Sequence, residues 1–224
     1  TYIKPFPVSV AFSNRYEYYA HGEPSSFQDE DMRKALNIEA RYIGLGVDRL
    51  DYTKGIVERF KAIEVLMTKH RSLRERFVFL QIAPLSKSNV LRYQELEREV
   101  TKEAERINEQ FGTNGWKPII LLKKRYNHED IYRFYRIADV CAVTTLHDGM
   151  NLVAKEFVAA RDDERGVLVL SKFAGASLEL EDALIINPYD VSQVADAIKA
   201  GLDMPKTEQR RRMRKMREVV RSNN

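Results

Sequence analysis

Short apolar runs rich in β-branched residues alternate along this chain with longer segments in which apolar residues recur at helical spacing. The predicted strands are residues 41–47, 77–83, 119–123, 140–145, 167–171 and 184–187. The predicted helices are residues 56–69, 90–111, 129–138 and 191–202, together with one that begins at Leu152. Strands that alternate with helices in this way predict an α/β fold in which a parallel sheet carries helices on both faces.

Composition favours a globular protein in a reducing compartment. The chain has 224 residues, of which 44% are hydrophobic, so it can bury a sizeable core. Its single cysteine, Cys141, falls in an apolar strand, which excludes an internal disulfide and indicates a buried thiol. No apolar run is long enough to span a bilayer, and the first residues lack the layout of a secretory signal. We therefore expect a soluble, cytoplasmic protein without a membrane partner.

Positive charge is concentrated near the carboxyl terminus. The formal net charge is +4, but residues 206–221 hold eight Lys or Arg against two Asp or Glu, so the rest of the chain carries about −2. Met213, Met216 and Val220 form one stripe of this tail, which predicts an amphipathic helix that packs on the domain. Nucleic-acid binding is the alternative, which we do not favour because no aromatic residue is interleaved with the basic ones.

The chain is predicted to have three parts. Residues 1–30, with their prolines and paired serines, are interpreted as an interdomain linker with a first strand at 6–12. Residues 31–205 are predicted to form the α/β domain, and a short helix over 29–37 leads into it. Residues 206–224 are the basic carboxyl-terminal helix.

The turn before the helix at Leu152 has the pattern of a phosphate site. Asp148-Gly149 ends the preceding strand and lets the backbone approach a ligand. A helix that begins at Leu152 directs unpaired N–H groups and the positive end of its dipole beyond the carboxyl end of that strand. Glu156 follows one turn later and can accept hydrogen bonds from sugar hydroxyls. The predicted ligand therefore combines a phosphate with a sugar.

A second charged turn stands at the carboxyl end of another predicted strand. Arg49 could bind a diphosphate by paired hydrogen bonds, and Lys54 could bind it as a point charge. The alternative is that both are surface residues paired with Asp48 and Asp51, and the pattern does not separate these interpretations. The preceding residues 44–46 begin like a dinucleotide fingerprint, but Arg49 stands where the third glycine belongs.

Acid–base chemistry and metal binding have weaker sequence signals. His147 beside Asp148 suggests an acid–base pair, but we favour the interpretation in which Asp148 caps the helix and His147 is a half-exposed turn residue. The four histidines are scattered without close second ligands, so no metal site is predicted, and no serine stands in a nucleophile elbow. Tyr126 and Lys87 follow other strands and could flank a base and meet an acceptor's charge, unless they are solvated loop residues.

Four segments together resemble the trehalose-6-phosphate synthase family: residues 47–55, 81–84, 148–156 and 170–175. The resemblance runs in order from about Phe6 to the end and corresponds to the carboxyl-terminal, nucleotide-sugar-binding half of that family. It implies a Rossmann-like domain that is one half of a GT-B fold. It also implies transfer of glucose from UDP-glucose to glucose 6-phosphate with retention of configuration, and no cofactor besides this donor substrate. Relatives that make glucosylglycerol phosphate share much of the pattern, and a non-catalytic nucleotide-sugar-binding module is a further alternative.

The resemblance implies one substrate-binding set: Arg49, Lys54, Ile82, Lys87, Tyr126, Asp148, Gly149, Met150, Asn151, Leu152, Val153 and Glu156. Within this set it implies that Arg49, Lys54 and Asp148 serve the chemistry. The two cations would bind the donor's diphosphate together with the N–H groups of Leu152 and Val153.

The remaining implied contacts concern the sugars and the base. Glu156 would hold the ribose hydroxyls, and Ile82 and Tyr126 would lie near the uracil. Asp148 and Asn151 would contact the glucose and the phosphates. Gly149 and Met150 belong to the same loop.

Several positions depart from the family pattern. Lys87 stands where an arginine often faces the acceptor's phosphate, and His147 stands where an arginine is common, so His147 is given no catalytic role. No counterpart of the family's amino-terminal, acceptor-binding domain is recognisable, so we expect a partner domain or subunit and little glucose transfer by this chain alone. A homo-oligomer is compatible with the pattern.

Overall fold

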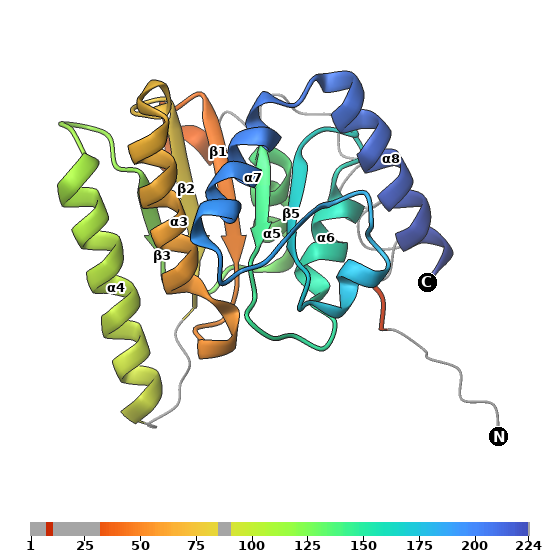
Figure 1. Ribbon diagram of the computed structural model, residues 1–224, viewed down its shortest axis with the longest axis horizontal. Helices are drawn as coiled ribbons and strands as arrows, with labels where there is room; N and C mark the ends of the chain where they lie inside the picture. Colours follow the sequence, from red (N-terminus) through yellow and green to blue (C-terminus); the bar gives the residue numbers. More distant parts are fainter. Residues whose placement is uncertain (1–7, 11–31, 85–90, 224) are drawn as a thin grey trace.

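The computed structural model describes residues 8–10, 32–84 and 91–223, and within them a single six-stranded sheet is seen (Figure 1). All its neighbouring strands pair in parallel, in the order β3-β2-β1-β4-β5-β6. The strands are β1 (Tyr42–Val47), β2 (Phe77–Ile82), β3 (Ile119–Leu122), β4 (Val140–Val143), β5 (Val167–Ser171) and β6 (Leu184–Ile186). The order reverses beside β1, which is where α/β sheets bind ligands at the carboxyl ends of their strands.

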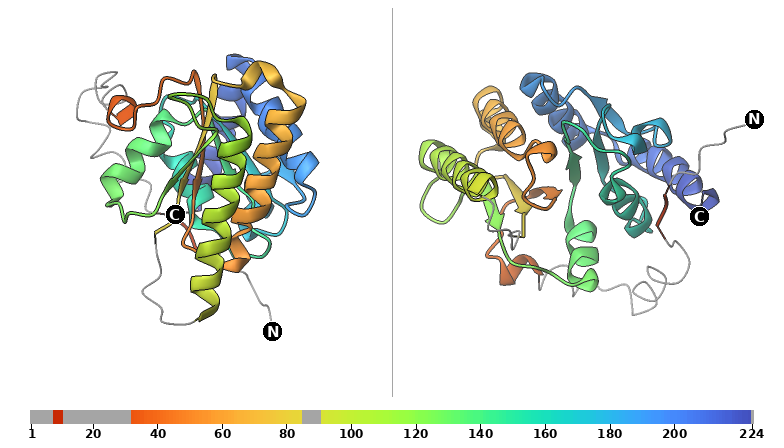
Figure 2. Two further views of the ribbon diagram at one scale, coloured as in Figure 1. Left: turned by 90° about the vertical axis from the view of Figure 1, so that its left-hand side faces the viewer. Right: turned by 90° about the horizontal axis from the view of Figure 1, so that it is seen from below.

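Helices cover both faces of the sheet (Figure 2). One face is packed by α3 (Ile56–Lys69), α4 (Leu91–Phe111) and α7 (Val191–Asp203). The other is packed by α5 (His128–Ile137), α6 (Leu152–Ala160) and α8 (Lys206–Ser222). Three short 3-10 helices also lie in the described part of the chain: η1 (Tyr52–Lys54), η2 (Arg71–Leu73) and η3 (Gly175–Leu178). The predicted α/β class and the parallel sheet are confirmed.

The two faces of the central strands have different cores. On β1, Ile43 and Leu45 are fully buried against α5 and α6, as expected for a strand with helices on both sides. On the opposite face, Gly44 leaves room for the aromatic rings of Phe77 and Phe79, because a Cβ at Gly44 would lie 2.6–2.8 Å from their ring carbons. The glycine pair 44–46 therefore serves packing and is not a dinucleotide fingerprint.

Most predicted boundaries hold within one or two residues. The strand predicted over 140–145 ends at Val143, because Thr144 and Thr145 already belong to the loop beside the cleft. The small helix expected near 173–177 is η3. The predicted strand at 6–12 falls largely outside the described residues, and of the helix predicted over 29–37 residues 32–35 are helical.

The basic tail forms a helix that packs on the domain. Met213, Met216 and Val220 of α8 are buried in the same core as α6, so the predicted stripe is the packing face. In the described part of the chain no helix is long and apolar enough to cross a membrane. Cys141 is a free, fully buried thiol, and burial raises its pKa well above the ordinary value.

Candidate functional site

The loops that follow β1, β2, β3 and β4 line one cleft of about 850 Å³ at the carboxyl ends of the strands. This is the end of the molecule seen in the right-hand view of Figure 2. Its lining includes most of the residues singled out from the sequence: Arg49, Lys54, Ile82, Tyr126, Asp148, Met150, Asn151, Leu152, Val153 and Glu156. Segments up to about a hundred residues apart in the chain are thus brought to one cavity.

The loop after β1 is held rigidly at its base. Asp51 accepts hydrogen bonds from the Thr53 N–H and hydroxyl, both at 2.9 Å, and so caps η1. Gly55 separates η1 from α3 with φ of 63°, and a Cβ there would meet the carbonyl oxygen of Thr144 at 2.6 Å. The Leu146 N–H donates to the Thr53 carbonyl at 2.8 Å. The loop after β1 is therefore fixed directly to the loop after β4.

Lys54 joins the same two loops through its side chain. Its ammonium lies 2.5 Å from Asp148 Oδ2, and both side chains are largely shielded from solvent. Partial burial raises the pKa of the Asp148 carboxyl, but the hydrogen bond and charge of Lys54, with the Met150 N–H and Asn151, outweigh it and lower the pKa below its ordinary value. Asp148 is thus an ionised carboxylate, which does not suit a general acid.

Arg49 differs from its neighbours because its guanidinium has no acceptor among the residues that the structure describes. Its side chain is exposed and lines the cleft, and no hydrogen bond or ion pair engages it within the described residues. The alternative pairing with Asp48 and Asp51 is wrong for both cations. Asp48 is bound by Arg59 at 2.6 Å, Asp51 caps η1, and Lys54 is paired with Asp148.

The helix start at Leu152 presents free backbone donors to the cleft. Asn151 has φ of 69° and is the N-cap of α6, where its side-chain oxygen accepts from the Ala154 N–H at 3.2 Å. The N–H groups of Leu152 and Val153 lie in the first turn, where backbone donors have no acceptor within the helix. The interpretation that Asp148 caps this helix is wrong; Asp148 instead accepts from the Asn151 amide at 3.1 Å.

Residues 173–176 form backbone hydrogen bonds with the loop after β4. The Asp148 N–H donates to the Phe173 carbonyl and the Asp148 carbonyl accepts from the Gly175 N–H, both at 3.1 Å. The Ala176 N–H donates to the Met150 carbonyl at 2.8 Å. A Cβ at Gly175 would collide with the carbonyl oxygen of Gly149. Gly149, which was predicted to bind substrate, is not among the residues that line the cleft.

The far wall of the cleft combines a carboxylate with apolar and aromatic side chains. Glu156 is half-buried, and its Oε2 accepts from the Tyr135 hydroxyl at 2.9 Å. Tyr126 packs edge-on against Phe134 with ring centroids 5.0 Å apart, and burial raises the pKa of Tyr126. Ile82 completes this wall. Lys87, predicted to face an acceptor, lies outside the described residues.

A family model for glycosyltransferase family 20 matches residues 1–224, that is, the whole sequence. The chain belongs to glycosyltransferase family 20. It is 41% identical over 216 residues to a bifunctional trehalose-6-phosphate synthase/phosphatase of Thermoproteus tenax, covering 96% of this chain and 29% of that protein. It is 47% identical over 178 residues to a trehalose-6-phosphate synthase of Klebsiella pneumoniae, covering 79% and 38%.

Solved structures of the family have the same fold. An alpha,alpha-trehalose-phosphate synthase (UDP-forming) from Burkholderia xenovorans, in complex with glucose-6-phosphate, superposes with a TM-score of 0.91 at 41% identity. A trehalose-6-phosphate structure from E. coli bound with UDP-2-fluoro glucose superposes with a TM-score of 0.90 at 39% identity. Each match covers 98% of this chain and 48% of the other. The resemblance seen in the motifs is confirmed, and the chain is one half of a GT-B architecture.

This family 20 site also contains residues that sequence reasoning missed. Arg59 of α3 is fully buried beneath the cleft, and the signal for it was a charged residue within the apolar stripe of a helix. Lys155 is buried as well, where it pairs with Glu179 at 2.8 Å and donates to the Val8 carbonyl at 3.0 Å. Val8 thereby becomes part of the cleft edge.

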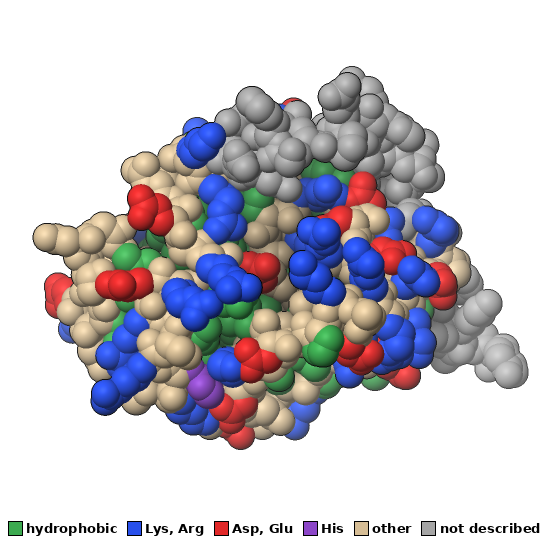
Figure 3. All heavy atoms as spheres, turned by 90° about the horizontal axis from the view of Figure 1, so that it is seen from above, with side chains coloured by type: hydrophobic (Ala, Val, Ile, Leu, Met, Phe, Trp, Pro, Cys, Tyr) green, Lys and Arg blue, Asp and Glu red, His purple; other side chains and the backbone are tan. Residues whose placement is uncertain are grey.

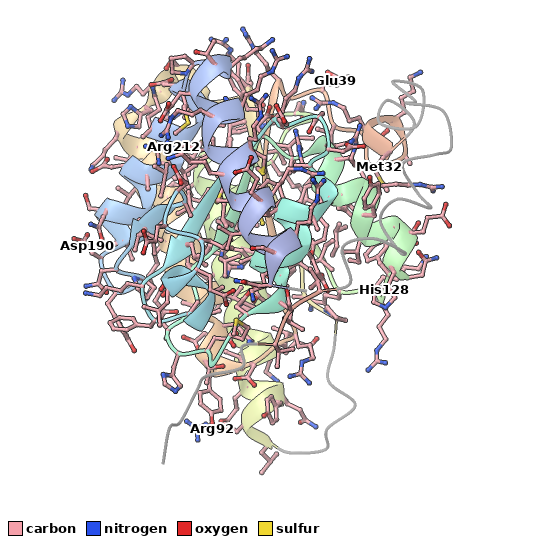
Figure 4. All side chains as sticks on the ribbon, turned by 90° about the vertical axis from the view of Figure 1, so that its right-hand side faces the viewer. Met32, Glu39, Arg92, His128, Asp190 and Arg212 are labelled. Atoms are coloured by element: carbon pink, nitrogen blue, oxygen red, sulfur yellow. The ribbon has the colours of Figure 1, made fainter. Side chains whose placement is uncertain are left out.

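One further cation of the family 20 chain stands beside the cleft entrance. Arg92 at the start of α4 lies at this end of the molecule, far from Arg212 of α8 (Figure 4). Its guanidinium stacks 4.5 Å from the centre of the Tyr52 ring. Among the described residues no group of three His, Cys, Asp or Glu side chains comes together in a way that could hold a metal ion.

Proposed function

We propose that this chain is the donor-binding half of a retaining glucosyltransferase that transfers glucose from UDP-glucose to glucose 6-phosphate. The observation that carries the proposal is that Arg49, whose guanidinium has no acceptor among the described residues, and the helix start at Leu152 line one cleft. A diphosphate between them would receive charged donors from one side and backbone N–H groups from the other. Family membership supports UDP-glucose as this ligand, because the matched relatives are trehalose-6-phosphate synthases.

The nucleoside of the donor would bind along the far wall of the cleft. Glu156 presents a carboxylate to accept hydrogen bonds from the ribose hydroxyls, and Tyr135 holds it in place from behind. The uracil would lie against Ile82 and Tyr126, which are the apolar and aromatic groups of this wall. A cleft of about 850 Å³ is large enough for a nucleotide sugar.

The loop after β4 would hold the sugar that is transferred. Asp148 and Asn151 would contact the glucose and the phosphates, which is supported by their place in the lining of the cleft beside Met150. Gly149 would contribute through its backbone. Lys87 remains our proposed contact for the acceptor's phosphate.

In the proposed reaction the bond between the glucose anomeric carbon and the β-phosphate oxygen breaks, and its electron pair stays on UDP. The acceptor's hydroxyl oxygen forms a new bond to the anomeric carbon on the same face, and its proton passes to the departing phosphate. Arg49, Lys54 and the N–H groups at Leu152 would stabilise the negative charge that develops on UDP. Preorganised donors of this kind are worth roughly 2.7–4 kcal/mol each. This scheme requires neither a protein nucleophile nor a general base.

The other half of the active site would come from an amino-terminal domain or subunit. The chain spans about half the length of the solved relatives and 29% to 38% of the curated relatives described above. We therefore propose that this chain alone binds UDP and UDP-glucose but transfers little glucose until that domain is supplied.

Calorimetry with UDP, UDP-glucose and ADP-glucose tests the proposal. We expect UDP to bind the wild type and Arg49→Ala to weaken it about ten- to hundredfold, because a charge-assisted contact is lost. Arg98→Ala is the matched control, since Arg98 is an exposed arginine of α4 outside the cleft lining. A wild type that ignores UDP would end the proposal.

Further arms separate the alternative functions. Tighter binding of ADP-glucose than of UDP-glucose would favour a glucosylglycerol-phosphate synthase-like enzyme with another donor or acceptor. Binding of UDP-glucose without turnover, even after addition of a family 20 amino-terminal domain, would favour a non-catalytic binding module. Retardation of DNA with steep salt dependence, without UDP binding, would identify a nucleic-acid binder instead.

A further inference from the structure

A buried arginine lies directly beneath the proposed diphosphate site. Arg59 projects from the apolar face of α3 toward the carboxyl ends of the strands, and its side chain is completely inaccessible to solvent. A buried charge is costly unless its partners are complete. The contacts of Arg59 show where these partners come from.

The guanidinium contacts three neighbouring strand ends. Its Nη1 donates to Asp48 Oδ2 after β1 at 2.6 Å and to Gln81 Oε1 on β2 at 2.7 Å. Its Nε donates to Thr144 Oγ1 after β4 at 2.8 Å. Its Nη2 lies 3.3 Å from the carbonyl oxygen of Lys54 at the end of η1. One side chain therefore fixes the bases of the loops that carry Arg49 and Lys54 and connects them to the strand leading to Leu152.

The strand beside Arg59 has a gap that fits the guanidinium. A Cβ at Gly46 of β1 would lie 2.5 Å from Arg59 Nη1 and would collide with Gln81 Oε1. A side chain at this position is thus incompatible with the network. Gly46 gives an independent reason to regard the Arg59 position as a built feature of the site.

Neutralisation of Asp48 is the main consequence for the cleft. The Asp48 carboxylate also faces Lys54, whose charge lies close enough to act on it. Burial raises the pKa of the Asp48 carboxyl, and the charge and hydrogen bond of Arg59 are the strongest influences that oppose this rise. Because Arg59 binds Asp48 from the interior, the positive charge of the loop stays directed into the cleft.

We propose that Arg59 is a positioning residue for the diphosphate: by binding Asp48, Gln81 and Thr144 together it keeps the Arg49 and Lys54 cations available to the ligand. The proposal rests on the proposed function, since it concerns the same cleft. It predicts a selective defect in diphosphate recognition. A purely structural role would weaken all ligands equally.

Titration of Arg59→Met with UDP by calorimetry and with uridine by NMR tests this. We expect UDP affinity to fall about tenfold or more while uridine affinity stays unchanged, since uridine has no diphosphate. Arg59→Lys, which keeps the charge but loses the fork of donors, should give a smaller loss. Arg106→Met, an arginine of α4 bound to surface Glu64 and Glu103, is the matched control.

The outcomes are distinct. Wild-type UDP affinity in the Arg59 variants, or equal losses for UDP and uridine, would overturn the positioning role while leaving the proposed function intact. A wild type that does not bind UDP would instead overturn the proposed function, and this inference with it. If Arg59→Met shows no cooperative thermal transition, the test is made with Arg59→Lys. A loss of UDP affinity greater than the loss of uridine affinity would again support the positioning role.

Discussion

The two ends of the sheet are both rich in arginine, but they differ in what the arginines contact. The surface at the amino-terminal ends of the strands carries many Lys and Arg side chains (Figure 3). A pocket of about 390 Å³ lies at this end, with Arg33, Arg41, Arg136, Arg161, Arg165 and Lys206 among its lining residues. At the carboxyl-terminal ends the cleft has fewer cations, yet this is where the proposed ligand binds.

At the amino-terminal end the chain itself supplies acceptors to the arginines that matter structurally. Arg161 is buried, donates to the carbonyls of Tyr135, Arg136 and Ala138 at 2.7–2.8 Å, and pairs with Asp163. On α8, hydrogen bonds from Arg211 and Arg212 lower the pKa of Glu208 to about 2. Arg214 pairs with Glu164 at 2.7 Å. The buried Arg161 holds the surrounding loops in place, whereas the exposed arginines of α8 form surface ion pairs that contribute little to stability.

At the carboxyl-terminal end the cations differ in how far the protein satisfies their hydrogen bonds. Arg59 completes its contacts inside the protein, Lys54 shares one carboxylate, and Arg49 has no acceptor within the described residues. The comparison teaches that the density of positive charge is a poor guide to a binding site. Donors that the fold positions but does not satisfy are a better one.

Arg161→Ala should produce the largest effect on stability. Removing a buried guanidinium that serves three carbonyls and Asp163 is expected to lower the free energy of unfolding by about 3–5 kcal/mol. UDP affinity of the folded protein should stay unchanged. Urea unfolding and calorimetry measure both quantities. Arg214→Ala, which removes a fully exposed arginine, should leave both unchanged; a loss of UDP affinity in either variant would break the contrast between the two ends.

Gly175→Ala should have an intermediate effect that appears in both stability and binding. Its Cβ would push against the carbonyl of Gly149, so the loop before Leu152 must shift. We expect a loss of about 1–3 kcal/mol in unfolding free energy, as for other overpacked sites, together with weaker UDP binding. Unaltered UDP affinity in a destabilised protein would mean that this support does not position the loop.

Tyr135→Phe should have a smaller effect, which lowers the affinities for UDP and for uridine equally. The ring still packs on Phe157, but the hydrogen bond to Glu156 is lost, which is worth about 1 kcal/mol. Because this contact concerns the ribose, UDP and uridine should weaken by the same factor of about fivefold. The same paired titrations check this. A loss for UDP alone would place Glu156 near the phosphates.

The smallest effect is expected from the titration of Asp148. Its pKa is lowered in the folded state, so its contribution to stability is present above the unfolded pKa of about 3.9 and is lost as the pH falls through the folded value. The melting temperatures of the wild type and Asp148→Asn should differ by a constant amount above about pH 5 and converge in stronger acid. A difference that changes between pH 6 and 8 would contradict an ionised Asp148.

The sequence alone predicted the fold because the alternation of strand and helix patterns is local. The six apolar runs between residues 41 and 187 each correspond to a strand, and their parallel pairing is typical of strands that alternate with helices. The strand ends were less predictable. β4 stops at Val143, and the next residue, Thr144, accepts a hydrogen bond from Arg59, which lies 85 residues away in sequence.

The sequence predicted the two loops of the site but not the contacts that join them. The two loops were recognisable because charged and glycine residues interrupt strand patterns at Arg49 and Gly149. Their pairing by Lys54 and Asp148, and the role of Asn151 as the helix cap, depend on tertiary contacts that spacing does not show. A cap at Asp148 fits the local pattern equally well until the positive φ of Asn151 is known.

NMR of the chain labelled with ¹⁵N at leucine and valine tests most directly whether the Arg49 loop and the start of α6 bind one diphosphate. We expect UDP to shift the amide signals of Leu152 and Val153 saturably, and uridine at matched occupancy to leave them in place. In Arg49→Ala these shifts should require about tenfold or more UDP. Equal shifts with uridine, or UDP binding that leaves both amides unchanged, would contradict a shared diphosphate site.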